Sequence, residues 1–225
     1  MLSLCEKPFV AFSGGKDSTV VSHLVRKIRP DILHVFYDYR GCNHLETETF
    51  LERCIEGGMN LLRYSQPSHI DVFKETGLIR HHTHRHSREY RKRVIARPWR
   101  ELLKEYGFDG SFTGLRARES GGRLSLLRSM GKKFFNKKDQ MWQFMPLGWW
   151  STEEIWMFID ATGVDYNTLY DTKLKFIDRL DHESRVSNWT LTTKINEGQI
   201  FWTKYFHLDL YHHLIRELPE AGLYV

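Results

Sequence analysis

The sequence predicts an α/β fold in which a parallel β-sheet is flanked by helices, with a helical extension at the C-terminus. Short apolar runs at residues 9–12, 32–37 and 61–64 alternate with segments of helical periodicity at residues 20–28 and 46–55. A strand–helix–strand order of this kind requires right-handed crossovers, and therefore parallel strands. The chain has 225 residues, enough for one packed domain with an appended segment.

The first predicted strand runs directly into the most informative stretch of the chain, which we call the glycine turn. It reads Ser13-Gly14-Gly15-Lys16-Asp17-Ser18 and precedes the first predicted helix. A helix that starts after such a turn leaves its first N–H groups unpaired, and these donors form an anion site together with the helix dipole. The two glycines let an oxyanion approach the backbone, the two serines add hydroxyl donors, and the lysine supplies a cation. The turn therefore predicts a phosphate site.

Asp17 is the unusual member of the glycine turn. A carboxylate beside a phosphate repels it unless a divalent cation lies between them, so Asp17 predicts Mg²⁺ held jointly by the protein and by phosphate oxygens. The spacing excludes a Walker A loop, which needs four residues between its first Gly and the Gly-Lys-Ser/Thr. The alternative interpretation is a strand-to-helix turn with chance glycines.

The second predicted strand is followed by Asp38, and the third covers residues 61–64. Ligands of an open parallel sheet bind outside the carboxyl ends of its strands. We therefore expect Asp38 near the same edge of the sheet as the glycine turn. Residues 94–106 then have helical periodicity, with a kink or break required at Pro98.

A fourth short strand at residues 111–113 leads into what we call the arginine segment, residues 114–123. It contains Arg116, Arg118 and Arg123, with two glycines that permit close approach. Arginines at the end of a strand suit forked hydrogen bonding to phosphate or sulfate. A basic surface loop is the alternative.

Two further stretches are rich in basic or histidine residues. Residues 131–138 carry four lysines around Phe134 and Phe135, which indicates an exposed hairpin or loop, either solvated or in contact with nucleic acid. Residues 81–86 contain four histidines, and His82 and His86 have the spacing of a helical metal pair. The arginines that follow favour a solvated basic face, or a lid over a polyphosphate.

The C-terminal part of the chain is predicted to be helical. Ser151 and Glu154 form a capping box at the start of one helix. Residues 199–215 are rich in aromatic and aliphatic side chains and read as another helix, packed against the core or against a second subunit. A homodimer through this helix is thus one expectation.

The bulk composition is that of a globular protein with a mild positive charge. The formal charge is +5, the hydrophobic share is 41%, and no apolar run approaches the length of a membrane span. The first residues lack an apolar signal core, and we expect a cytoplasmic protein that does not bind membranes. Cys5, Cys42 and Cys54 contain no CxxC pair, which argues against a disulfide framework, a zinc ribbon or an iron–sulfur cluster.

Four of these motifs, in the same order, resemble the PP-loop ATP pyrophosphatases and their relatives, the sulfonucleotide (PAPS and APS) reductases. The glycine turn resembles the signature Ser-Gly-Gly-x-Asp-Ser, and Asp38 with residues 46–50 resembles Asp-Thr-Gly…Glu-Thr-x-x-Phe. The arginine segment resembles Gly-Leu-Arg-x-x-Glu/Gln-Ser-x-x-Arg, and residues 146–171 resemble the closing Pro-Leu-x-x-Trp…Tyr-Asn-x-Leu-Tyr-Asp block. The resemblance runs from about Phe9 to Asp171.

The resemblance implies a Rossmann-like fold of the HUP (adenine nucleotide alpha-hydrolase-like) type over residues 1–171, with a helical extension over 172–225. It implies ATP or PAPS as the bound nucleotide, with Mg²⁺ at Asp17. Lys16, Asp17 and Arg116 become the expected catalytic residues. The expected nucleotide-binding residues are Ser13, Gly14, Gly15, Ser18, Asp38, Arg118 and Arg123.

The chain departs from the reductases at two places. The C-terminal Glu-Cys-Gly segment that carries their attacking thiol is missing, and Ser87-Arg88 stand where cluster-containing members have cysteines. We therefore expect no iron–sulfur cluster, and we expect ATP-dependent adenylation of an acceptor with release of pyrophosphate. The alternatives are a sulfonucleotide enzyme with thiol supplied by a partner, and a non-catalytic nucleotide-binding protein. Nucleic acid, a sulfur-carrier protein and a small metabolite all remain open as acceptors.

Overall fold

The computed structural model describes residues 1–39, 41–76, 88, 92–171 and 199–224. The chain divides into two compact units. The first contains Met1–Tyr37, Thr49–Tyr64 and Leu102–Asn167, and the second contains Asp38–Glu48, Ser65–Glu101 and Thr168–Val225. The glycine turn and the arginine segment both belong to the first unit.

The strands form one six-stranded sheet in the order β3-β2-β1-β4-β6-β5. Their bounds are β1 Pro8–Ala11, β2 Leu33–Tyr39, β3 Leu61–Gln66, β4 Gly110–Phe112, β5 Lys133–Asn136 and β6 Met141–Phe144. β1 pairs in parallel with β2 and β4, and β4 pairs in parallel with β6. β5 adds an antiparallel edge through a hairpin with β6. The predicted parallel sheet is confirmed, and the predicted basic hairpin lies at its edge.

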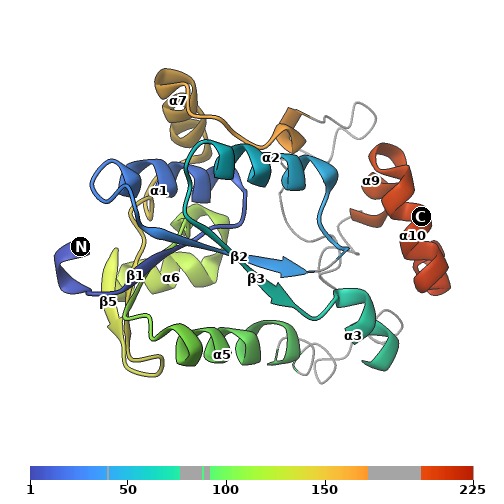
Figure 1. Ribbon diagram of the computed structural model, residues 1–225, viewed down its shortest axis with the longest axis horizontal. Helices are drawn as coiled ribbons and strands as arrows, with labels where there is room; N and C mark the ends of the chain where they lie inside the picture. The colour runs from blue at the N-terminus through green and yellow to red at the C-terminus, as the bar shows by residue number, and fades with distance from the viewer. Residues whose placement is uncertain (40, 77–87, 89–91, 172–198, 225) are drawn as a thin grey trace. The chain divides into compact units, whose positions relative to one another are not determined.

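Helices of the first unit cover the sheet through apolar faces. They are η1 Leu2–Leu4, α1 Lys16–Arg26, η3 Ala117–Glu119, α6 Gly121–Met130 and α7 Thr152–Thr162, while α2 Leu45–Glu56 and α5 Arg97–Tyr106 belong in part to each unit. Figure 1 shows α1 and α7 on the same side of the strands. Both contribute to one core cluster with the sheet, which includes Val10 of β1, Phe112 of β4, Val21 of α1 and Ile155 of α7.

The order of the strands creates a switch point between β1 and β4. The chain passes from β1 to β2 and β3 on one side, and then returns to place β4 on the other side of β1. In open α/β sheets, ligands bind outside the carboxyl ends of the strands at such a point. The glycine turn follows β1 and the arginine segment follows β4, so the topology brings both predicted anion-binding segments to this edge of the sheet.

Local signals in the sequence account for several helix ends. Ser151 Oγ accepts a hydrogen bond from the backbone N–H of Glu154 at 3.1 Å, and the Glu154 carboxylate accepts one from the N–H of Ser151 at 2.6 Å, which confirms the predicted capping box. Pro98 lies in the first turn of α5, where an N–H has no partner within the helix, and a π-helical turn precedes it. The apolar helical pattern predicted for residues 20–28 is wrong at its end: α1 already ends at Arg26, and Ile28 is 75% exposed.

The second unit has its own core and most of the remaining helices. These are α3 His69–Thr76, η2 Lys92–Ala96, η4 Thr168–Asp171, α9 Gln199–Phe206, α10 Leu208–Glu217 and η5 Pro219–Tyr224. The single helix predicted for residues 199–215 is two helices, α9 and α10, separated at His207. Leu214 of α10 is buried in a cluster with Ile70 and Phe73 of α3, so packing within the unit explains part of its apolar composition.

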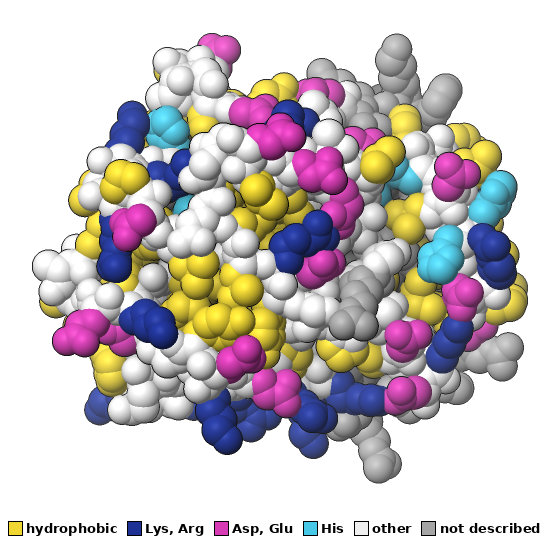
Figure 2. Space-filling model, in the orientation of Figure 1, with side chains coloured by type: hydrophobic (Ala, Val, Ile, Leu, Met, Phe, Trp, Pro, Cys, Tyr) yellow, Lys and Arg dark blue, Asp and Glu magenta, His cyan; other side chains and the backbone are white. Residues whose placement is uncertain are grey.

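The described helices and the surface agree with the bulk composition. Among the described residues, no helix is both long enough and apolar enough to cross a membrane. Figure 2 shows acidic and basic side chains sharing one face of the molecule, with Lys and Arg side chains gathered along its lower margin.

Candidate functional site

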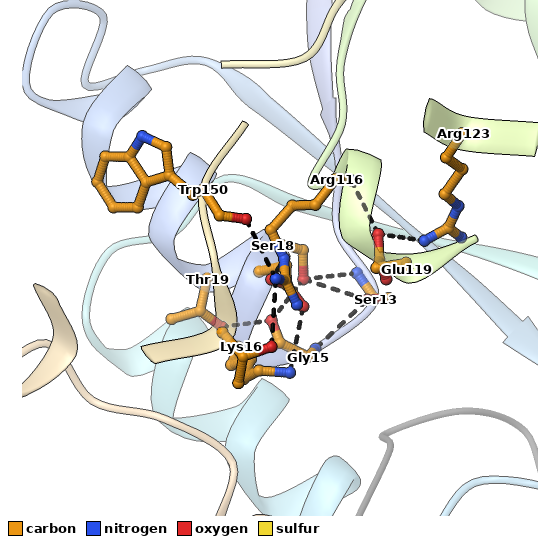
Figure 3. A network of polar contacts seen from close by, with 11 residues as sticks. Ser13, Gly15, Lys16, Ser18, Thr19, Arg116, Glu119, Arg123 and Trp150 are labelled. Atoms are coloured by element: carbon orange, nitrogen blue, oxygen red, sulfur yellow. Dashed lines mark hydrogen bonds and ion pairs between the residues drawn. The ribbon is translucent and has the colours of Figure 1, made fainter. Parts of the chain in front are cut away.

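The glycine turn is braced by its own two serines (Figure 3). Gly14 has φ +71°, in the left-handed region that favours glycine, and Gly15 is the N-cap of α1. Ser13 Oγ accepts a hydrogen bond from the N–H of Gly15 at 3.3 Å, and Ser18 Oγ accepts one from the N–H of Ser13 at 3.2 Å. Ser18 Oγ also donates to the carbonyl of Gly15 at 2.8 Å. The turn is thus held in shape by contacts among its own residues.

Lys16, Asp17 and Arg116 form what we call the cationic cluster. The Asp17 carboxylate contacts Arg116 Nε at 2.5 Å through one oxygen and Lys16 Nζ at 3.5 Å through the other. Arg116 Nη1 donates to the carbonyl of Trp150 and to Thr152 Oγ1, both at 3.3 Å. Figure 3 shows the Arg116 side chain extending to the glycine turn from the segment that follows β4. The fold therefore joins two predicted site residues of the glycine turn to one of the arginine segment.

The charge of the cationic cluster favours an anion. Lys16 and Arg116 are each only 3% exposed, and the side chain of Asp17 is 19% exposed. Two positive charges and one negative charge leave a net charge of +1 in a largely buried position. Because an uncompensated buried charge is costly, a bound anion stabilises this arrangement. Backbone N–H groups at the start of α1 add to the same effect.

Gly114 is the residue that lets the two segments approach each other. A Cβ atom at this position would lie 2.9 Å from the carbonyl carbon and from the Cβ of Asp17, and 3.0 Å from the backbone nitrogen of Ser18. Real Cβ atoms essentially never approach other atoms below 3.0 Å. The close approach of the β4 extension to the first turn of α1 therefore requires glycine here.

The other two arginines of the arginine segment lie toward the solvent. Glu119 accepts a hydrogen bond from the backbone N–H of Arg116 at 2.8 Å and forms an ion pair with Arg123, whose side chain is 37% exposed. Arg118 is exposed on η3. Glu119 thus links the position of Arg123 to the buried Arg116, while a ligand role for the exposed Arg118 stays a prediction.

Asp38 belongs to the second unit, where it lies near the end of β2. Asn43 Nδ2 donates to the Asp38 carboxylate at 3.0 Å and to the Glu48 carboxylate at 2.7 Å. Its role at the glycine turn stays a prediction. The histidines at residues 81–86 lie outside the described residues, as does Arg91, whereas Arg88 and Arg93 are described.

The donor set around Asp17 decides how a metal would bind. Within the described part of the chain, no three His, Cys, Asp or Glu side chains converge on one point where a metal ion could bind. A Mg²⁺ bound through substrate phosphates needs only one or two carboxylates from the protein, so Asp17 suits that role. Both oxygens of Asp17 contact cations in this structure, and a metal would share the carboxylate with Lys16 and Arg116.

The three cysteines are not activated thiols. Burial raises the pKa of Cys5 to about 11 and that of Cys54 to about 12. Burial also raises the pKa of Cys42, which has no exposed surface. A nucleophilic cysteine needs the opposite, a lowered pKa and an accessible sulfur.

Two groups that position Arg116 escape sequence analysis. The carbonyl of Trp150 is a backbone group, which no side-chain pattern marks. Thr152 is the first residue of α7, and its hydroxyl contacts Arg116 only because α7 packs beside α1. The capping box signals a helix start at this point of the chain but not the contact.

Comparison with known proteins identifies relatives of two kinds. The family model described as the phosphoadenosine phosphosulfate reductase domain matches residues 7–205, beyond the end of the motif resemblance at Asp171. Sulfate adenylyltransferase subunit 2 of Photorhabdus laumondii is 24% identical over 208 residues, covering 76% of this chain and 62% of the relative. Its counterpart in Hyphomonas neptunium is 28% identical over 192 residues, covering 74% of this chain and 56% of the relative. The chain thus spans about 60% of the length of these relatives.

Solved structures show the same fold at lower identity. Phosphoadenylyl-sulfate reductase from Candida auris, in a phosphate complex, has a TM-score of 0.57 at 18% identity, covering 73% of this chain and 77% of that one. FMN adenylyltransferase from Candida glabrata, in complex with FAD and inorganic pyrophosphate, has a TM-score of 0.51 at 16% identity, covering 73% and 51%. These similarities confirm the predicted Rossmann-like HUP fold.

Proposed function

The chain belongs to the phosphoadenosine phosphosulfate reductase domain family, and from this premise we propose that it is an enzyme that binds ATP, adenylates an acceptor and releases pyrophosphate. The observation that carries the proposal is the cationic cluster beside the glycine turn. Its buried Lys16 and Arg116 exceed the charge of Asp17 by one, at the switch point where α/β folds bind ligands. A polyphosphate supplies the anionic charge that this position lacks.

In the proposed reaction, an oxygen or nitrogen atom of the acceptor attacks the α-phosphorus of ATP. A bond forms between that atom and the phosphorus, while the bond from the phosphorus to the bridging oxygen of the β-phosphate breaks. The electron pair leaves with pyrophosphate, and the proton of the acceptor passes to solvent. Because negative charge develops on the leaving group, fixed cations beside it lower the barrier.

Each site residue has a distinct part in this proposal. The glycine turn binds the β- and γ-phosphates through Ser13, Gly14, Gly15, Lys16 and Ser18. Arg116 neutralises the leaving group from its buried position, while Arg118 and Arg123 contact the outer phosphates or the acceptor. The family resemblance assigns Asp38 to nucleotide binding, and this assignment stays a prediction. Holding the reacting atoms in line is the second contribution of such a site.

In this proposal, Mg²⁺ binds to the protein together with the nucleotide. Asp17 would be its protein ligand, and the ion would supply further charge neutralisation on the phosphates. The same carboxylate keeps Lys16 and Arg116 paired before the nucleotide binds.

The alternative is reduction of a sulfonucleotide, which requires a thiolate to attack sulfur. The raised pKa values of Cys5, Cys42 and Cys54 disfavour an attack by this chain. That reaction would need a thiol from a partner protein. The three unpaired cysteines also support our proposal of a cytoplasmic location, where thiols stay reduced.

Two product assays on one sample test the proposal. With ATP and Mg²⁺ we expect slow release of pyrophosphate, which an acceptor accelerates. Release of sulfite from PAPS on addition of a thiol, with no pyrophosphate from ATP, would instead establish the sulfonucleotide alternative. Tight nucleotide binding with neither product, across nucleic-acid, carrier-protein and small-molecule acceptors, would indicate a non-catalytic protein.

A further inference from the structure

A second positively charged region of the first unit lies outside the cationic cluster. Between residues 120 and 138 the sequence has six Lys or Arg residues and neither Asp nor Glu. Arg123 is paired with Glu119, and the other five side chains are exposed. These five, which define what we call the basic surface, are Arg128, Lys132, Lys133, Lys137 and Lys138. Among the described residues, none of the five forms an ion pair.

The elements that carry the basic surface are packed on each other. Helix α6 and strand β5 share one apolar cluster, in which the buried Leu127 of α6 packs beside Met145 and the half-buried Phe134 of β5. The backbone N–H of Met145 donates to the carbonyl of Lys132 at 2.8 Å, and the hairpin of β5 and β6 continues from there. The inner side chains are therefore fixed, while the five cations of the basic surface are exposed to solvent.

An exposed aromatic ring lies on the same strand as one of these cations, Lys133. Phe135 is 40% exposed, and side chains alternate along a strand, so it shares a face of β5 with Lys133 and not with the inward Phe134. Trp142 of β6 lies against its edge, with ring centroids 5.6 Å apart. The ring is thus held in place while one part of it stays open to solvent.

A second exposed ring lies on a loop that packs against α6. A Cβ atom at Gly148 would lie 2.6 Å from Leu127 Cδ2, so the loop after β6 contacts α6 directly. The next residue, Trp149, is 48% exposed, and the one after it supplies the carbonyl that binds Arg116. Two of the five cations, Lys137 and Lys138, lie between Phe135 and Trp149 along the chain.

We propose that the basic surface binds a single-stranded nucleic acid. Its lysines and arginine contact the phosphates, and Phe135 stacks on a base. Cations alone would serve any polyanion, but solvent-exposed rings beside them are the means by which proteins bind unpaired bases. The binding uses none of the residues assigned to ATP, so it goes beyond the adenylation proposal and does not depend on it.

The first test measures binding of a fluorescent 20-nucleotide oligo-dT by anisotropy over a range of salt concentrations. Five phosphate contacts predict a slope of about −3.5 in a plot of log affinity against log salt for a single strand, or roughly a hundredfold loss between 50 and 200 mM. Replacing Lys137→Gln and Lys138→Gln together should reduce the slope by about 1.4. The matched control, Lys27→Gln with Lys104→Gln, also removes two exposed cations of the same unit and should leave the slope unchanged.

A second variant tests the stacking. Phe135→Leu keeps an apolar side chain on the scaffold and removes the ring, so affinity for oligo-dT should fall roughly tenfold while duplex DNA is unaffected. Equal binding of single and double strands, with no effect of Phe135→Leu, would overturn the proposal. So would binding to vesicles of phosphatidylcholine and phosphatidylserine in place of oligo-dT. Pyrophosphate release from ATP, measured on the same variants, separates this outcome from a failure of the adenylation proposal.

Discussion

Replacing Asp17 with Asn removes the carboxylate that lies between Lys16 and Arg116. Both cations are 3% exposed, so the change leaves two buried positive charges close together without this counter-charge. Asparagine keeps the size and shape of the side chain, so the loss reports on charge. We expect the ligand-free protein to be less stable and to bind anions more strongly.

The magnitude follows from the geometry. At the 3.5 Å separation of Lys16 and Asp17, an effective dielectric constant of about 20 gives a gross attraction of about 5 kcal/mol, part of which offsets desolvation. Removing one partner of a buried ion pair typically costs about 3–5 kcal/mol. Because Asp17 is 19% exposed and partly screened, we expect the lower end, about 3 kcal/mol. For a protein of this size that corresponds to a fall in Tm of about 6–12 °C.

Thermal unfolding with a matched surface control measures this effect. Asp165→Asn breaks an ion pair with Arg53 at 2.8 Å, whose side chains are 60% and 35% exposed, and should cost no more than about 1 kcal/mol. Added pyrophosphate should raise the Tm of Asp17→Asn more than that of the wild type. Equal losses in the two variants, with no difference in the response to pyrophosphate, would refute the account of the cationic cluster.

Three further changes have defined outcomes. Gly114→Ala forces a Cβ atom against Asp17 and should cost about 1–3 kcal/mol in urea unfolding, whereas Gly121→Ala, with open space around it, should cost far less. Burial lowers the pKa of His34 from 6.5 to about 4, so the unfolded chain binds a proton that the folded protein excludes. The folded protein therefore has its full stability above pH 6.5 and loses about 3 kcal/mol of it as the pH falls toward 4. The free energy of unfolding of His34→Gln should fall less on acidification, as measured by urea unfolding at about pH 7 and pH 4.5. The three cysteines should react slowly with a thiol reagent in the folded protein and rapidly in denaturant, and replacing all three with Ser should leave pyrophosphate release unchanged.

The glycine turn could be predicted because its signal is local. Six consecutive residues specify a strand end, a turn and a helix start, and the backbone of Gly14 and Gly15 follows from those residue types. The parallel sheet also followed from the sequence, since the alternation of strands and helices leaves few topologies. For the same reason, the arginine segment was correctly predicted to follow a strand of the sheet. The switch point between β1 and β4, in contrast, emerged only from the strand order of the structure.

The contacts within the site could not be predicted. Asp17 and Arg116 meet only because Gly114 lets the segment after β4 pass close to the first turn of α1, and the sequence shows no pairing between such distant positions. Strand β6 was missed because Met141–Phe144 is short and only partly apolar, and its identity as a strand comes from pairing with β4. The break at His207 likewise depends on packing in the second unit and not on helical periodicity.

Calorimetric titration of ATP into the wild type and into Gly15→Asp tests the central claim most directly. Gly15 is the helix N-cap with φ −85°, a position that aspartate favours, so the variant should fold while its carboxylate opposes a phosphate. Gly222→Asp adds the same charge at an exposed position of the second unit and serves as the control. We predict at least a tenfold loss of affinity, about 1.4 kcal/mol, for Gly15→Asp and none for the control. Full affinity in Gly15→Asp would contradict nucleotide binding at the glycine turn.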